Sequence, residues 1–241
     1  MTSSKLAVIV TVLAIAAATL GGCGGSSDPT AQVNRVVCID STTSTDGNRM
    51  SYLPDLLEVA EAAVNDHAWL AVSACGANST GTVRWPIREE LVSRQAISGT
   101  LAQRFVKKTT EKLKPRLERV LSQESHHNGT PLGEMLSVLG RQCEAIGGTC
   151  HAYLFTDGGW ADGQLKIRYG VTKAEQEDYV QTYAPDMKGL AGASVCFVGV
   201  GYGTHLGEKR LREGRQVATS LVEQVGGHVT SWNVRLPSGG V

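Results

Sequence analysis

A cluster of small oxygen-bearing side chains follows a short apolar stretch near the start of the chain. Residues 36–39 are Val-Val-Cys-Ile, which is typical of a buried strand, and residues 40–44 are Asp-Ser-Thr-Thr-Ser. Asp40, Thr42 and Ser44 therefore supply one carboxylate and two hydroxyls close together. These are the hard oxygen donors that Mg²⁺ prefers. Alone the pattern is a weak signal, because most Ser/Thr-rich turns only satisfy their own backbone.

A second stretch that can supply an oxygen ligand is Gly129-Thr130-Pro131. Glycine permits an unusual turn, Thr130 is a suitable helix N-cap, and proline suits the first helical position. The N-cap role explains Thr130 fully by itself. It is also compatible with a metal-binding role, because a capping threonine lies where loops converge.

A third stretch ends another apolar run with Thr156-Asp157-Gly158. An Asp-Gly turn is ordinary loop chemistry. However, Asp40 and Asp157 would each end a core strand, and adjacent strand ends in an α/β sheet form the crevice where ligands bind. Two carboxylates brought together there repel each other unless they share a cation. Together the stretches predict a cation site.

Alternating apolar periodicities predict the elements that would position these residues. Strands are expected at 36–39, 69–74, 82–85, 152–155, 193–200 and 229–234, and helices at 52–66, 98–122, 131–146, 174–183 and 208–225. The alternation predicts an α/β fold with a doubly wound, mostly parallel central sheet flanked by helices.

Residues 34–235 resemble a von Willebrand factor A-type domain, the fold of integrin inserted domains. The resemblance rests on the three stretches above, with Thr42 in place of the family's first serine. It implies a metal-ion-dependent adhesion site formed by Asp40, Thr42, Ser44, Thr130 and Asp157. Mg²⁺ is the expected ion, with Mn²⁺ and Ca²⁺ as alternatives, and the last coordination position would take a carboxylate from a protein partner.

The N-terminus predicts export and lipid attachment. A cationic start and an apolar run at residues 6–20 form a signal peptide over residues 1–22, and Leu-Gly-Gly-Cys before a Gly/Ser stretch resembles a lipobox ending at Cys23. Residues 23–33 would be the lipidated cysteine and linker, and 236–241 a tail. The protein is expected at the extracytoplasmic face of a bacterial membrane. The alternative is an ordinary signal peptide or an uncleaved anchor.

Apart from Cys23, the chain has an odd number of cysteines, so at least one of them stays free or pairs between molecules. Cys143 and Cys150 flank a Gly-Gly turn and are the predicted disulfide. Cys38 and Cys196 lie inside apolar strands and are expected to be unpaired and buried.

Charge and composition exclude some classes of function. Lysines and arginines total 23, as do aspartates and glutamates, so net charge does not favour nucleic-acid binding. The helix at 98–122 is basic, and its cations could contact lipid head groups or a partner, or form a solvated face. Trp160 lies in a loop near the predicted site, either as a partner contact or as a packed aromatic.

The residues favour a binding protein over an enzyme. Neither a phosphate-binding loop nor a zinc-protease motif occurs, and no nucleophile is paired with a base. Two alternatives stay open: a metal-dependent hydrolase that uses the same carboxylates, and a structural lipoprotein whose site has degenerated.

Overall fold

The computed structural model describes residues 32–76, 83–92, 99–123, 129–233 and 235. Residues from Gln32 to Val241 form one compact unit, and both hydrophobic cores lie within it. Cys23, the predicted signal peptide and the tail 236–241 lie outside the described residues.

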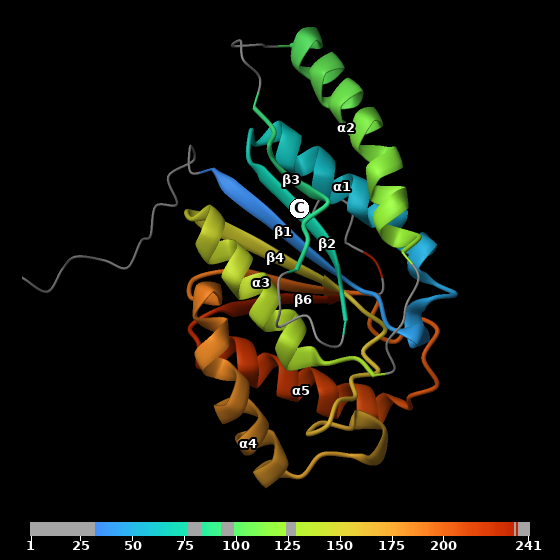
Figure 1. The fold of residues 1–241 in the computed structure, drawn as a ribbon, viewed down its shortest axis with the longest axis vertical. Helices are drawn as coiled ribbons and strands as arrows, with labels where there is room; N and C mark the ends of the chain where they lie inside the picture. Colours follow the sequence, from blue (N-terminus) through green and yellow to red (C-terminus); the bar gives the residue numbers. More distant parts are fainter. Residues whose placement is uncertain (1–31, 77–82, 93–98, 124–128, 234, 236–241) are drawn as a thin grey trace, which may run out of the picture. The chain divides into compact units, whose positions relative to one another are not determined.

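A single six-stranded sheet forms the centre of this unit, in the order β3-β2-β1-β4-β5-β6 (Figure 1). The strands are β1 (Val33–Asp40), β2 (Trp69–Cys75), β3 (Ile87–Glu90), β4 (Thr149–Phe155), β5 (Ser194–Val198) and β6 (His228–Asn233). Strands β1 and β4 are central neighbours and run parallel, so their carboxyl ends meet at one edge.

The predicted doubly wound, mostly parallel sheet is wrong, because the sheet is mixed. β3 pairs with β2 in antiparallel orientation, with Trp69 opposite Glu90 and Val72 opposite Ile87. A parallel neighbour would need a crossover of a dozen or more residues, usually a helix, and only residues 76–86 connect these strands. The predicted strand at residues 82–85 is also wrong. Residues 83–85 are not a strand, and β3 begins after Pro86.

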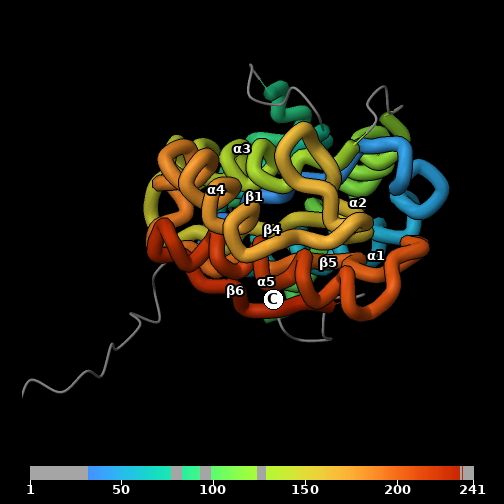
Figure 2. Tube along the Cα trace, turned by 90° about the horizontal axis from the view of Figure 1, so that it is seen from below, coloured from blue at the N-terminus to red at the C-terminus, as the bar shows by residue number. Residues whose placement is uncertain are grey.

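Helices cover both faces of the sheet. They are α1 (Leu53–Asn65), α2 (Thr100–Leu121), α3 (Leu132–Ile146), α4 (Lys173–Tyr183) and α5 (Glu208–Gln224). Val37 and Ile39 of β1 pack in one core with α1 and α2, whereas Val36 and Cys38 pack in the other with α3 and α5. Because both faces are buried, residues 36–39 of β1 are a continuous apolar run rather than an alternating one. Figure 2 shows α5 and β6, both in red, close together.

Two disulfides occur in the described part of the chain. Cys143 and Cys150 are joined, which is the predicted pair, and Cys38 of β1 is joined to Cys75 of β2. The expectation that Cys38 is unpaired is therefore wrong. Cys196 is buried and free.

None of the described helices is both long enough and apolar enough to cross a bilayer.

Candidate functional site

The candidate site lies where β1 and β4 end. Ile39 is paired with Phe155, so Asp40 and Thr156 are the next residues along the two strands, and Asp157 follows. Asp40, Thr156 and Asp157 are all buried. The pairing of two parallel strands thus brings together acids that lie far apart in the sequence.

Hydrogen bonds join four of the predicted ligands. The Thr42 hydroxyl donates to Asp40 Oδ1 over 2.7 Å and lies 2.9 Å from Thr130 Oγ1 and 3.2 Å from Ser44 Oγ. Thr42 and Thr130 are buried, whereas Ser44 is exposed. Thr42 is therefore the central residue of a cluster of oxygen atoms drawn from two separate loops.

Thr130 does not cap α3, which corrects the prediction for this residue. Pro131 is the N-cap residue of α3, and no side-chain hydrogen bond caps the helix. The Thr130 hydroxyl is instead directed to Thr42, while its carbonyl accepts a 3.0 Å hydrogen bond from the Ala161 amide. Gly129 makes this turn possible: its φ is +98°, and a Cβ there would lie 2.6 Å from the Ala161 carbonyl oxygen.

Burial and hydrogen bonding act in opposite directions on Asp40. Burial raises the pKa of this carboxyl to about 6, and the nearby charge of Asp157 acts in the same direction. Hydrogen bonds from the Thr42 hydroxyl, the Thr42 amide and the Thr156 hydroxyl oppose that rise. The charged form of Asp40 is thus stabilised by hydrogen-bond donors but not by solvent.

Asp157 is held in place by its own loop. Its Oδ1 accepts a 2.8 Å hydrogen bond from the Gly159 amide, and its carbonyl accepts one of 2.9 Å from the Gly201 amide. The second contact ties the end of β4 to the loop after β5. The charge of Asp157 is one of the causes that raise the pKa of Asp40.

Sequence reasoning did not assign a role to Thr156, although it lies within the third stretch. Its hydroxyl donates to Asp40 Oδ2 over 2.9 Å and accepts a 3.2 Å hydrogen bond from the Gly158 amide. The sequence does contain a signal that could have identified Thr156. A hydroxyl residue stands next to Asp157, as hydroxyl residues stand next to Asp40 at residues 40–44.

Arg49 and Tyr52 were also missed, because neither belongs to one of the three stretches. Arg49 is buried, forms an ion pair with Asp46 and donates a 2.5 Å hydrogen bond to the Gln123 carbonyl. Burial lowers the Arg49 pKa, and the charge of Asp40 opposes that shift. Burial, Asp40 and other acidic groups raise the pKa of Tyr52, so its hydroxyl stays protonated. Arg49 supplies a positive charge near Asp40.

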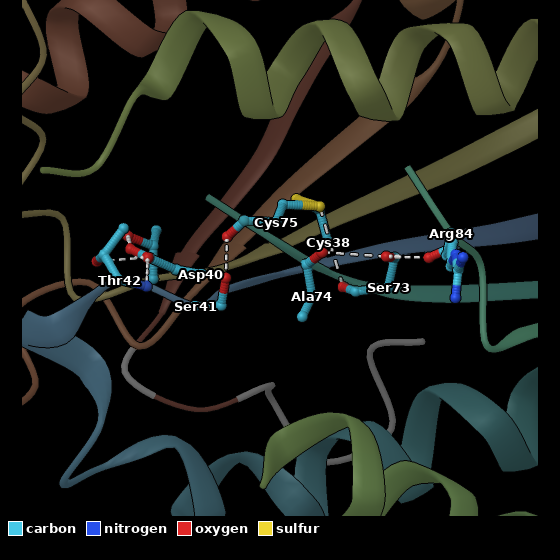
Figure 3. Close-up of a disulfide and its surroundings, with 9 residues drawn as sticks. Cys38, Asp40, Ser41, Thr42, Ser73, Ala74, Cys75 and Arg84 are labelled. Atoms are coloured by element: carbon cyan, nitrogen blue, oxygen red, sulfur yellow. Dashed lines mark hydrogen bonds between the residues drawn. A yellow bond between two sulfur atoms is a disulfide. The ribbon is translucent and has the colours of Figure 1, made fainter. Parts of the chain in front are cut away.

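The disulfide between Cys38 and Cys75 lies directly beside the site (Figure 3). The Cys75 carbonyl accepts hydrogen bonds from the Ser41 amide at 2.8 Å and the Ser41 hydroxyl at 2.9 Å. Ser41 is the residue between Asp40 and Thr42. The disulfide therefore joins β1 to the end of β2, and β2 in turn holds the loop that carries the predicted ligands.

Trp160 is not a surface contact for a partner. It is 1% exposed and packs edge-to-face against Phe197 and Trp232 in the core. A Cβ on Gly214 of α5 would lie 2.9 Å from its ring, so the helix packs closely over the tryptophan. Of the two alternatives for Trp160, the packed aromatic holds.

The donor set fits a hard cation better than a soft one. Among the described residues, no group of three or more His, Cys, Asp or Glu side chains is arranged to hold a metal ion. The site instead combines the carboxylates of Asp40 and Asp157 with hydroxyls, and Mg²⁺ binds few carboxylates and keeps water in its shell. Because Thr42 donates its proton to Asp40, its oxygen accepts from the hydroxyls of Thr130 and Ser44, and an ion would take the place of these two protons.

Comparisons with known proteins give a coarse likeness and no family. No protein-family model matches the chain, and no curated protein matches it. Among solved structures, it is similar to a D319A mutant of the PilB minor pilin from Streptococcus sanguinis, with 10% identity and a TM-score of 0.48. It is also similar to the human COPII-coat protein Sec24c, with 9% identity and a TM-score of 0.47.

These likenesses cover 84% and 85% of this chain, but only 57% of the pilin and 30% of the coat protein. The chain therefore spans less than two thirds of either protein.

Proposed function

We propose that this protein is a lipid-anchored, extracytoplasmic binding module that holds a protein partner through a Mg²⁺ ion. The ion would be held by Asp40, Thr42, Ser44, Thr130 and Asp157. A carboxylate of the partner would complete its coordination, so that the ion links an acidic group of this protein to an acidic group of the partner.

One observation carries the proposal: the Thr42 hydroxyl oxygen lies within 3.2 Å of oxygens from Asp40, Ser44 and Thr130. Thr130 lies 88 residues from Thr42 in the sequence, and neither an N-cap nor a local turn accounts for its place in the cluster. Two buried acids nearby add a reason for a cation, since their mutual repulsion falls when a positive ion is shared. The three stretches that supply them resemble a metal-ion-dependent adhesion site.

The residues around the cluster have separate tasks in this proposal. Thr156 orients Asp40 by donating to Oδ2, and the Gly159 amide orients Asp157. The bound ion would supply a positive centre that accepts an oxygen ligand. The exposed position of Ser44 leaves one side of the cluster open to an incoming group.

The test is calorimetric titration of Mg²⁺ into the unit Gln32–Val241, alone and with acetate as a stand-in for the partner's carboxylate. We expect one site. Thr42→Val should weaken Mg²⁺ binding by at least about tenfold, because it removes the central oxygen with little change in shape. Thr42→Ser, which keeps the hydroxyl, should bind Mg²⁺ like the unchanged protein.

Two results would contradict the proposal. One is the absence of Mg²⁺ binding in the unchanged protein even with acetate present. The other is equal Mg²⁺ affinity in Thr42→Val and the unchanged protein, which would move the ion away from this cluster.

A further inference from the structure

Helix α2 carries a concentration of positive charge that the metal site does not use. Between Thr100 and Leu121 it has seven lysines and arginines but only two acids, Glu111 and Glu118. The whole chain has 23 basic and 23 acidic residues. The surplus of positive charge on this helix is therefore balanced by acidic residues elsewhere in the chain. Such an asymmetry is typical of a surface that meets an anionic partner.

Four of these cations lie on the side of α2 that faces away from the core. Leu113, Leu117, Val120 and Leu121 are buried. The opposite side is exposed and is called the basic face here; its cations are Arg104, Lys108, Lys112 and Arg119. Their spacing of four, four and seven residues keeps them on one side of a helix.

Neighbouring acids do not neutralise the basic face. Arg116 points aside and pairs with Glu89 of β3 over 2.5 Å. Lys107 and Lys114 line a groove between α1 and α2, together with Glu61 and Glu111. Within the described residues, no ion pair involves the four cations of the basic face.

Placing these cations on one side of α2 costs free energy, and solubility alone does not require this placement. Cations four residues apart on a helix repel each other, and both the pair Arg104–Lys108 and the pair Lys108–Lys112 have that spacing. A helix that only faces water is usually better served by mixed signs. The first turn of α2 also exposes an apolar side chain on the same side: Leu101 is 61% exposed.

We propose that the basic face of α2 adsorbs to an anionic phospholipid surface. The row from Arg104 to Arg119 is about 24 Å long at the usual rise of an α-helix, which suits a plane of head groups. Leu101 would enter the boundary between head groups and acyl chains, as apolar residues of surface-bound helices do. The predicted lipid on Cys23 would keep α2 within reach of such a surface.

A lipid surface fits these features better than a nucleic acid does. Leu101, exposed on the same side as the cations, can enter a bilayer, whereas a phosphate backbone offers an apolar side chain no such environment. Adsorption of α2 does not depend on the metal site, so failure of either proposal leaves the other intact.

Vesicle co-sedimentation of the unit Gln32–Val241 tests the proposal, with phosphatidylcholine vesicles that contain or lack phosphatidylglycerol. We expect binding only to the anionic vesicles, weakened by added salt because the charges are exposed. Replacing the four cations of the basic face by glutamine should lower the partition coefficient about 100-fold or more. Leu101→Ser should cause a smaller loss, which persists at high salt.

The matched control removes the same charge from other exposed positions. Its four cations are Lys166, Lys188, Lys209 and Arg212, each replaced by glutamine. This variant should keep most of the vesicle binding, and equal melting temperatures would show that both variants fold. Equal loss in both variants, equal binding to neutral vesicles, or binding only to a soluble polyanion such as heparin would each overturn the proposal.

Discussion

At the scale of single residues, the ionisation of Asp40 links the site to pH. Its carboxyl is fully buried, and burial raises its pKa from 3.8 to about 6. Between these values the folded, metal-free protein holds a proton on Asp40 that the unfolded chain has released. The folded state is therefore favoured below about pH 4, and this contribution to stability is lost as pH rises through 6.

We expect the metal-free protein to lose up to about 3 kcal/mol of unfolding free energy from this group between pH 4 and pH 7. Asp40→Asn should remove this part of the pH dependence, because the amide does not titrate. Urea denaturation with a chelator present, at several pH values, measures the effect. The matched control is Asp186→Asn, which makes the same substitution at an exposed position.

The same carboxyl should govern Mg²⁺ affinity, since an ion and a proton compete for it. Mg²⁺ binding is expected to weaken as pH falls below about 6. An affinity that stays constant from pH 7 to pH 5 would argue that Asp40 is not a ligand.

At the scale of elements, the two disulfides differ in what they hold. Cys38–Cys75 joins β1 to β2 beside the candidate site, and the Cys75 carbonyl anchors Ser41. Cys143–Cys150 joins the end of α3 to the start of β4, at the opposite end of that strand from Asp157. Both cross-links stabilise the fold, but only the first is connected to the ligand loop.

We predict that replacing Cys38 and Cys75 by alanine lowers both stability and Mg²⁺ affinity. Loss of the cross-link should cost about 2–4 kcal/mol of unfolding free energy, and the freed strand end should loosen the residues that hold Asp40 and Thr42. Denaturation and Mg²⁺ titration of the same variant measure the two effects. The variant with Cys143 and Cys150 replaced by alanine is the control: it should lose stability and keep its Mg²⁺ affinity. Equal affinities in the two variants would contradict the prediction.

At the scale of the whole molecule, an ion that binds only the folded state should stabilise the entire unit. The site joins β1, β4 and the loop before α3, and these segments separate on unfolding. The binding energy of such an ion would therefore add to the stability of the fold as a whole.

We expect Mg²⁺ at about 100 times its dissociation constant to add about 2.7 kcal/mol to the unfolding free energy. For a unit of this size, that is a rise in melting temperature of roughly 5–10 °C. Scanning calorimetry with and without the ion measures this shift. Thr130→Val should show a much smaller shift, because it removes one hydroxyl of the cluster; an equal shift in this variant would place the ion elsewhere.

Local sequence patterns determined much of the element structure. The apolar run before Asp40 predicted β1, and periodic apolar residues predicted the five helices, because burial of one helix face leaves a repeat in the sequence. Oxygen-bearing residues at strand ends also indicated which side chains converge, since parallel strands that pair also end together. Asp40, Thr42, Ser44 and Thr130 are in fact joined by hydrogen bonds.

Only the tertiary structure decided the features that depend on neighbours distant in sequence. The direction of β3, the burial of Trp160 and the pairing of Cys38 with Cys75 each depend on which segment lies alongside. No local pattern encodes that choice, because a strand, an indole or a thiol can satisfy its chemistry with several partners. The same holds for Thr130: a free hydroxyl at a helix start favours an N-cap until the Thr42 oxygen is brought within 2.9 Å.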